Sequence, residues 1–126
     1  MSKYNNSGQS LISLIIFMVM ATMIISGAVA VIVTNSKTTS KFYQGSISYD
    51  IAEAGIENAI LRLLRDPNYA GETLTVGSDT AIITVTGNSD NYTITSRGSS
   101  GNFARTVQVV TSYNNNVLTV TSWKEQ

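Results

Sequence analysis

The sequence predicts an α+β protein in which one long N-terminal helix packs on an antiparallel β-meander of four or five strands. Two changes of pattern along the 126 residues support this fold. A charge-free apolar run continues into residues with helical spacing, with no proline before Pro67, whereas beyond Gly71 the apolar residues alternate with a period of two. The strand-like segments are joined by short links of Gly, Asn and Asp, which favour hairpins and therefore an antiparallel sheet.

The apolar run extends from Leu11 to Val33 and contains 23 residues, none of them charged. As a helix it covers roughly 34 Å, which is enough for a hydrocarbon core of ~30 Å. The rest of this short chain cannot surround such a helix, so we expect residues 9–33 to form a transmembrane segment. Lysines precede and follow the run, so their distribution does not settle its orientation.

Two other membrane interpretations stay open. A cleaved secretory signal peptide is compatible with Lys3 before the run and with the small residues Ala28 and Ala30 at a possible cleavage site. However, the apolar run exceeds the usual core of ~7–15 residues, and it continues through Val33. A plain single-pass anchor fits the length but leaves the residues before the run unexplained.

Residues 34–66 form the second, amphipathic part of the predicted helix. Its apolar residues recur at steps of mostly three and four, as expected for one side of a helix that covers a sheet. Ile47 and Ile51 lie off this stripe and are expected to need a second contact, such as another subunit. The stripe consists of Phe42, Tyr49, Ala52, Ile56, Ala59, Ile60 and Leu63.

The helix is predicted to run from about Gln9 to Arg65, because the residue before a proline avoids the helical conformation. Gly55 in mid-helix costs about 1 kcal/mol relative to Ala, so it indicates a close approach of the sheet or of a neighbouring helix. Arg62 and Asp66, four residues apart, are expected to form an ordinary surface ion pair.

Residues 67–126 are assigned to the sheet and are expected to pack with 34–66 as one globular unit, because they are too few to bury a core alone. The predicted strands are Thr73–Val76, Ala81–Thr86, Tyr92–Thr95, Thr106–Thr111 and Val117–Trp123. One face is predicted to be apolar, with Ile83, Val85, Tyr92, Ile94, Val107 and Val109, and the other to expose Thr84, Thr86, Thr93 and Thr95. Tyr113 and Trp123 are assigned to core or edge packing.

The composition excludes several classes of function. The chain has no Cys and no His, which excludes a Ser-His-Asp triad, a Cys nucleophile and a thiolate or imidazole metal site within it. Its net charge of zero argues against a nucleic-acid-binding module. Asp50, Glu53 and Glu57 lie near one another on the helix, but without the cleft or loop that acid catalysis or Ca²⁺ binding needs. We therefore assign them to a solvated face or to subunit contacts, and expect no enzyme activity, cofactor or metal.

Three features carry a resemblance to a known family. The polar start of the chain ends in Gly8, followed by Gln9 and the apolar run. Residues Ala52, Glu53, Ala54, Gly55 and Glu57 form an Ala-Glu-Ala-Gly-x-Glu stretch. Together with the order of a long helix before an antiparallel sheet, these features resemble the type IV pilin-like superfamily, most closely the PilX-like minor pilins.

This resemblance implies a structural role for the chain. A prepilin peptidase would remove the leader, residues 1–8, by cutting between Gly8 and Gln9, and would methylate the new amine; the family usually has Phe in place of Gln9. Before assembly, the protein would be a single-pass protein of the cytoplasmic membrane with its leader in the cytoplasm. Its implied partners are other pilin subunits, through the N-terminal helix, and the pilus assembly machinery.

Two further features of the apolar run bear on assembly into a filament. Ser13 is the fifth residue after the implied cut, where most members of the family carry Glu. Thr22, Ser26 and Ala30 form a row of small residues at four-residue steps, which suits packing between membrane helices. The alternative function is a membrane-anchored or secreted extracytoplasmic binding module or enzyme with a small all-β domain.

Overall fold

The computed structural model describes residues 7–88 and 90–126 and has the α+β fold predicted from the sequence. One long helix is followed by five strands: α1 (Ser7–Arg65), β1 (Thr73–Val76), β2 (Asp79–Asn88), β3 (Asn91–Ser100), β4 (Phe103–Asn114) and β5 (Val117–Glu125). The helix ends at Arg65, directly before the Asp66-Pro67 pair that predicted its end. Residues 1–6 of the predicted leader lie outside the described residues.

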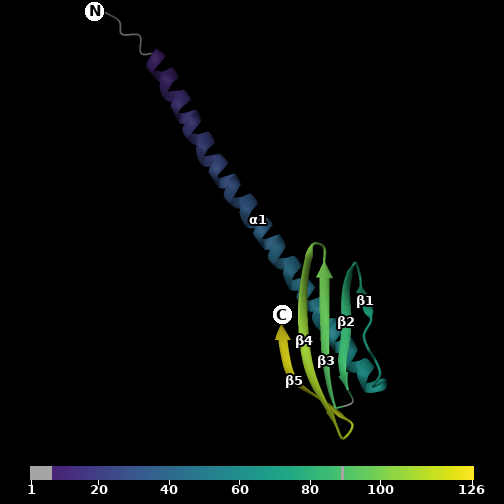
Figure 1. Cartoon of the computed structure of the whole chain (residues 1–126). Helices are drawn as coiled ribbons and strands as arrows, with labels where there is room; N and C mark the ends of the chain where they lie inside the picture. Colours follow the sequence, from purple (N-terminus) through teal and green to yellow (C-terminus); the bar gives the residue numbers. More distant parts are fainter. Residues whose placement is uncertain (1–6, 89) are drawn as a thin grey trace, which may run out of the picture. The chain divides into compact units, whose positions relative to one another are not determined.

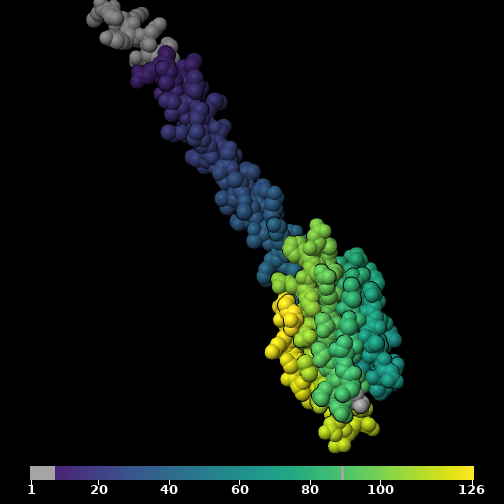
Figure 2. Space-filling view, viewed as in Figure 1, coloured from purple at the N-terminus to yellow at the C-terminus, as the bar shows by residue number. Residues whose placement is uncertain are grey.

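The chain divides into two compact units, Met1–Ser40 and Lys41–Gln126. In the first unit, the described residues belong to α1 alone, and nearly all of their side chains are exposed (Figure 2). Ile24, for example, is 73% exposed. This part of α1 is long and apolar enough to be a candidate membrane span.

In the second unit, five antiparallel strands form one sheet in the order β1-β2-β3-β4-β5. Each strand therefore pairs with its neighbour in sequence, and the sheet is a meander, as the short links predicted. The second part of α1 covers one face of this sheet (Figure 1). The opposite face carries the exposed Thr84 and Thr86, which pair across the strands with the half-buried Thr95 and Thr93.

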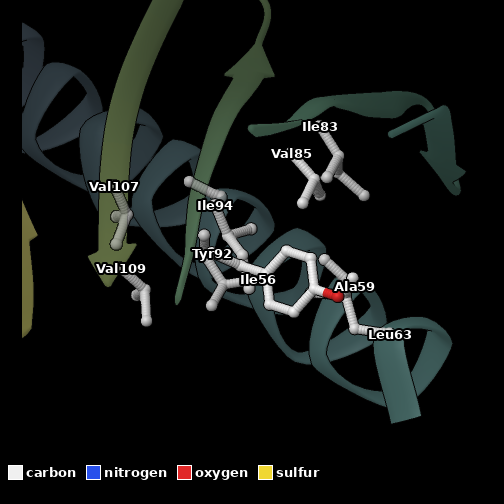
Figure 3. Packing of buried hydrophobic residues seen from close by; sticks show 10 residues of the cluster. Ile56, Ala59, Leu63, Ile83, Val85, Tyr92, Ile94, Val107 and Val109 are labelled. Carbon is white, nitrogen blue, oxygen red and sulfur yellow. The ribbon is translucent and has the colours of Figure 1, made fainter. Parts of the chain in front are cut away.

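The hydrophobic core lies between α1 and the sheet (Figure 3). All six residues of the predicted apolar face are buried, as are Ala52, Ile56, Ala59 and Leu63 of the predicted helix stripe. Tyr49 and Ile60 pack against this core from the side, together with Tyr113. Trp123 lies on the edge strand β5, where it pairs with Val109 of β4, and remains 38% exposed.

One prediction about the helix stripe is wrong, and another is made specific. Phe42 is 81% exposed, because Gly45, one turn later, is the first residue of α1 that is buried. Ile51, which lies off the stripe and is expected to need a second contact such as another subunit, finds that contact within this chain, where it is buried. Helix and sheet lie so close that the row of α1 beside the central stripe is covered as well.

Glycine allows this close approach on both sides of the contact. A Cβ atom at Gly55 would clash with the Ser96 hydroxyl and would lie 3.0 Å from Cβ of Ala81. A Cβ atom at Gly98 of β3 would clash with backbone atoms of Ser48 and Ala52 in α1. The expectation that Gly55 indicates a close approach is therefore confirmed, and its neighbour is the sheet.

Strands β2, β3, β4 and, by two residues, β5 are longer than predicted. The segment from Gly98 to Ser100 belongs to β3 and not to a link, and the turn is confined to Gly101 and Asn102. Gly98 is needed for contact with α1 and not for a change of chain direction. A true turn follows β4, where Asn115 and Asn116 have φ of 51° and 63°, as in a two-residue hairpin with left-handed residues.

Candidate functional site

The processing position implied by the resemblance lies in the first turns of α1. Gly8 and Gln9 are both helical and exposed. A Cβ atom at Gly8 would meet nothing within 4 Å, so the fold of this unit does not require glycine there. Any requirement for a small residue at position 8 must come from a partner that acts on the chain.

Ser13 makes a contact that the sequence did not predict. Its Oγ donates a hydrogen bond of 3.0 Å to the carbonyl oxygen of Gln9, one helical turn earlier. Ser13 is thus bonded to the residue that would become the first of the mature chain. A hydroxyl bonded in this way has its donor satisfied and can enter an apolar environment at lower cost.

The two hydroxyls of the small-residue row are satisfied in the same way. Thr22 donates to the carbonyl of Val19 at 2.8 Å, and Ser26 donates to the carbonyl of Thr22 at 2.8 Å. Ala30 supplies its carbonyl to the hydroxyl of Thr34 at 2.9 Å. The row lies on an exposed part of α1, and the hydroxyls of Thr22 and Ser26 have partners in the helix's own backbone, which suits a helix without water around it.

The Ala-Glu-Ala-Gly-x-Glu stretch is divided between two environments. Ala52 and Gly55 are buried where the helix backbone meets the sheet. Glu53 is half-buried, and Glu57 is exposed, as is Asp50. The small residues of the stretch therefore serve the core of this chain, and its carboxylates are left for solvent or a partner. No group of three or more metal-binding side chains occurs in the part of the chain that the structure describes.

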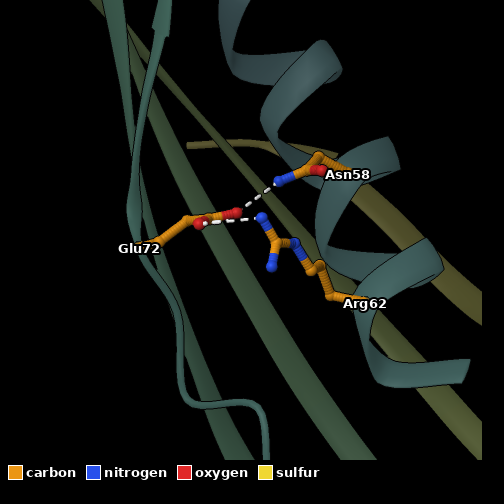
Figure 4. Close-up of polar contacts among 3 residues, drawn as sticks. All are labelled: Asn58, Arg62 and Glu72. Atoms are coloured by element: carbon orange, nitrogen blue, oxygen red, sulfur yellow. Dashed lines mark hydrogen bonds and ion pairs between the residues drawn. The ribbon is translucent and has the colours of Figure 1, made fainter. Parts of the chain in front are cut away.

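A polar cluster that the sequence did not predict joins the end of α1 to the start of the sheet (Figure 4). Glu72 accepts a hydrogen bond of 2.6 Å from the Asn58 amide and forms an ion pair of 3.3 Å with Arg62. The predicted pair of Arg62 with Asp66 is therefore wrong. Asp66 instead accepts a bond from the backbone N–H of Asn68 in the turn that follows the helix.

Tyr69 lies beside this cluster. Its hydroxyl is buried near the Glu72 carboxylate without a well-formed hydrogen bond, and the Arg62 guanidinium lies 6.0 Å from its ring centre. Burial raises the pKa of the Tyr69 hydroxyl above 10.0, and the negative charge of Glu72 raises it further. Glu72 directly follows Gly71, which has a φ of 125° where the chain changes direction. In the sequence, this glycine is the one signal that points to the cluster.

At least two depressions lie in the described surface of the second unit. One, of about 240 Å³, lies beside Phe42 and Tyr49 and contains the 2.9 Å ion pair of Arg105 and Glu125. The other, of about 410 Å³, lies between the loop after α1 and the end of β2. Neither was predicted from the sequence, because each is formed by segments that are distant along the chain.

Comparison with known proteins adds no relative. No family model, curated protein or solved structure matches the chain. Its function is therefore inferred from the apolar helix, from the residues that carry the resemblance and from the helix–sheet unit that follows.

Proposed function

We propose that this chain is a minor, structural subunit of a type IV pilus or a related filament and that it takes part in filament assembly. The observation that carries this proposal is one continuous helix whose first part is apolar on all sides and whose second part packs into a small folded unit. Such a helix needs lipid before assembly and other helices afterwards, and a filament with a helical centre supplies the second environment.

The energetics of the first part of α1 support both lipid and neighbouring helices as its surroundings. Fully burying one large apolar side chain contributes about 1.5–3 kcal/mol, and more than a dozen such side chains are exposed between Leu11 and Val33. Between helices in lipid, small residues and satisfied hydroxyls favour association. Thr22 and Ser26 are small and have satisfied hydroxyls, and they place no charge in the membrane.

Ser13 favours a minor subunit over the main one. A carboxylate at this position would cost on the order of 2.5–3.5 kcal/mol in the membrane, and pairing with the terminal amine of a neighbour would remove that cost. The Ser13 hydroxyl is uncharged and is bonded to Gln9, so it provides no comparable reason to leave the lipid. Such a subunit suits a filament tip or an initiation complex.

Processing provides the direct test. With a prepilin peptidase present, we expect a mature chain that begins at Gln9, and we expect Gly8→Leu to remain uncleaved in the membrane fraction. Gly27→Leu is a matched control, because a Cβ atom at either glycine would meet nothing within 4 Å. The intact mass measured by mass spectrometry distinguishes these products.

The same measurement separates the two candidate functions. A mature chain that begins at Val31 would support a secreted binding module and contradict the pilin. Normal cleavage of Gly8→Leu would also contradict it.

The minor role has its own test. In sheared filaments analysed by quantitative proteomics, we expect this chain to be far less abundant than a companion pilin with Glu at the corresponding place. We expect Ser13→Glu to increase the amount of this chain in the filament. If the wild-type chain were the most abundant component, the minor role would be refuted.

A further inference from the structure

The larger depression, of about 410 Å³, has the size of a ligand site. It lies within the second unit, at the edge of β2 where the chain leaves α1. Its volume falls within the usual range of about 300–1,000 Å³ for small-molecule sites. It is lined by Pro67, Asn68, Tyr69, Ala70, Val85, Thr86, Gly87, Asn88 and Tyr92.

A backbone donor faces this depression. On the outer edge of β2, the N–H of Ile83 donates to the carbonyl of Glu72, and the N–H of Val85 donates to that of Ala70, each at 2.8 Å. The N–H of Gly87 is next in this alternation. Among the described residues, it has no backbone acceptor on that side, so the ladder ends where the depression begins.

Side-chain amides and a hydroxyl lie around this donor. Asn88 Oδ1 accepts the backbone N–H groups of Asp90 and Asn91, both at 3.3 Å, which leaves its NH₂ group as a donor. The side-chain amide of Asn68 makes no hydrogen bond within the described part of the chain, and Asn68 is exposed. Thr86 is held only by a long bond of 3.5 Å to the carbonyl of Thr93.

The apolar part of the lining comes from Pro67, Tyr69, Ala70, Val85 and Tyr92, and the site is held in shape without a ligand. The Tyr92 hydroxyl donates to the carbonyl of Pro67 at 3.1 Å, which ties the loop after α1 to β3. Tyr92 is itself part of the hydrophobic core, and Tyr69 packs against that core. A ligand would therefore meet a wall that is already ordered, which lowers the entropic cost of binding.

We propose that this depression binds a neutral saccharide. None of the described residues that line it carries a charge, so a charged ligand would lose its hydration without gaining an opposite charge. Amide donors and acceptors match the alternating donor and acceptor capacity of sugar hydroxyls. The exposed Pro67 ring and the half-buried Tyr69 ring match the C–H faces of a sugar ring, whereas Tyr92, at 6% exposure, supports them from the core.

The free edge of β2 is too short to bind an extended peptide, which is the main competing ligand. A peptide that adds to a sheet needs several consecutive backbone partners. Here Glu72 and Ala70 already occupy the sites before Gly87, so one donor remains. This binding activity does not depend on whether the chain enters a filament.

The test uses the full chain in phosphatidylcholine nanodiscs, because detergents with maltoside or glucoside headgroups would compete for the site. The protein is screened against a glycan array with neutral, sialylated and sulfated members, and the affinity for each retained glycan is measured by isothermal titration calorimetry. We expect retention of at least one neutral glycan. Asn68→Ala and Thr86→Val should each weaken its binding at least fivefold.

Matched controls repeat the same chemistry outside the depression. Thr84→Val lies on the same strand and the same face as Thr86, and Asn102→Ala lies in another exposed turn. Both should bind within about twofold of wild type. Retention of no neutral glycan, of acidic glycans alone, or of a neutral glycan whose affinity is unchanged in Asn68→Ala and Thr86→Val would overturn the proposal.

Discussion

Between Leu11 and Val33, α1 exposes apolar side chains on every side, whereas between Ser48 and Leu63 it directs most of them against the sheet and leaves Leu61 exposed. The side chains are chemically alike. Ile24 is 73% exposed in the first segment, and Ile56 is fully buried in the second. The difference shows that the distribution of apolar residues around a helix determines its surroundings, because a single covered stripe requires a sheet and a complete apolar surface requires lipid or other helices.

Glycine shows the same contrast. A Cβ atom at Gly27 in the first segment would meet nothing within 4 Å. At Gly55 and Gly98 the added atom would clash across the contact between helix and sheet. The same residue type is thus indispensable to the fold in one region and is left free for contacts with other molecules in the other.

The sharpest test of this comparison replaces one isoleucine in each segment. Ile56→Ala should lower the free energy of unfolding of the sheet unit by about 2–5 kcal/mol, because it leaves a cavity in the core. Ile24→Ala should leave that free energy unchanged. Both can be measured on the full chain in nanodiscs by urea titration, with the fluorescence of Trp123, the only tryptophan, as the signal. Equal effects of the two substitutions would contradict the division of roles along α1.

The next largest effect is expected from glycine. Gly98→Ala should destabilise the sheet unit by about 2 kcal/mol or more, because the atoms it meets belong to the helix backbone and cannot turn aside. Gly27→Ala should leave the unfolding of that unit unchanged. The same titration measures both variants. A Gly98→Ala variant as stable as wild type would mean that α1 and β3 do not make this close contact.

The smallest effect concerns pH and is expected only in the second unit. Because the pKa of Tyr69 is raised by folding, the unfolded chain loses this proton near pH 10.0 and the folded chain loses it at higher pH. The stabilisation is therefore complete below pH 10 and is lost as the pH rises through the folded pKa. Between pH of about 8 and about 11, wild type should lose more stability than Tyr69→Phe. Tyr43→Phe, at an exposed position, should follow the wild type, and parallel curves for wild type and Tyr69→Phe would refute the effect.

The fold was predictable because its strongest signals are local. The period changes from 3.6 to two near Gly71, and Pro67 marks the end of the helix, so the α+β class and the meander follow from neighbouring residues. The inward face of the sheet, from Ile83 to Val109, was also predictable, since alternation alone assigns it. The position of Phe42 was not, because periodicity does not tell where along a helix the sheet begins.

The polar contacts and the larger depression could not be predicted in this way. Glu72 meets Asn58 and Arg62 only because the loop between α1 and β1 turns back beside the end of the helix, and no periodic pattern records that turn. Gly98 is ambiguous in the sequence, because glycine permits both a turn and a close backbone contact. Only the packed structure distinguishes the two.

The two glycine contacts between helix and sheet also have a mechanical consequence. A force along the axis of α1 within the second unit would have to slide Gly55 past Ser96 and Gly98 past Ala52 at the same time. At both points, atoms of the opposite layer occupy the space that a Cβ atom on the glycine would need. The two contacts therefore interlock the helix and the sheet, and they should oppose shear in addition to the apolar area buried between the layers.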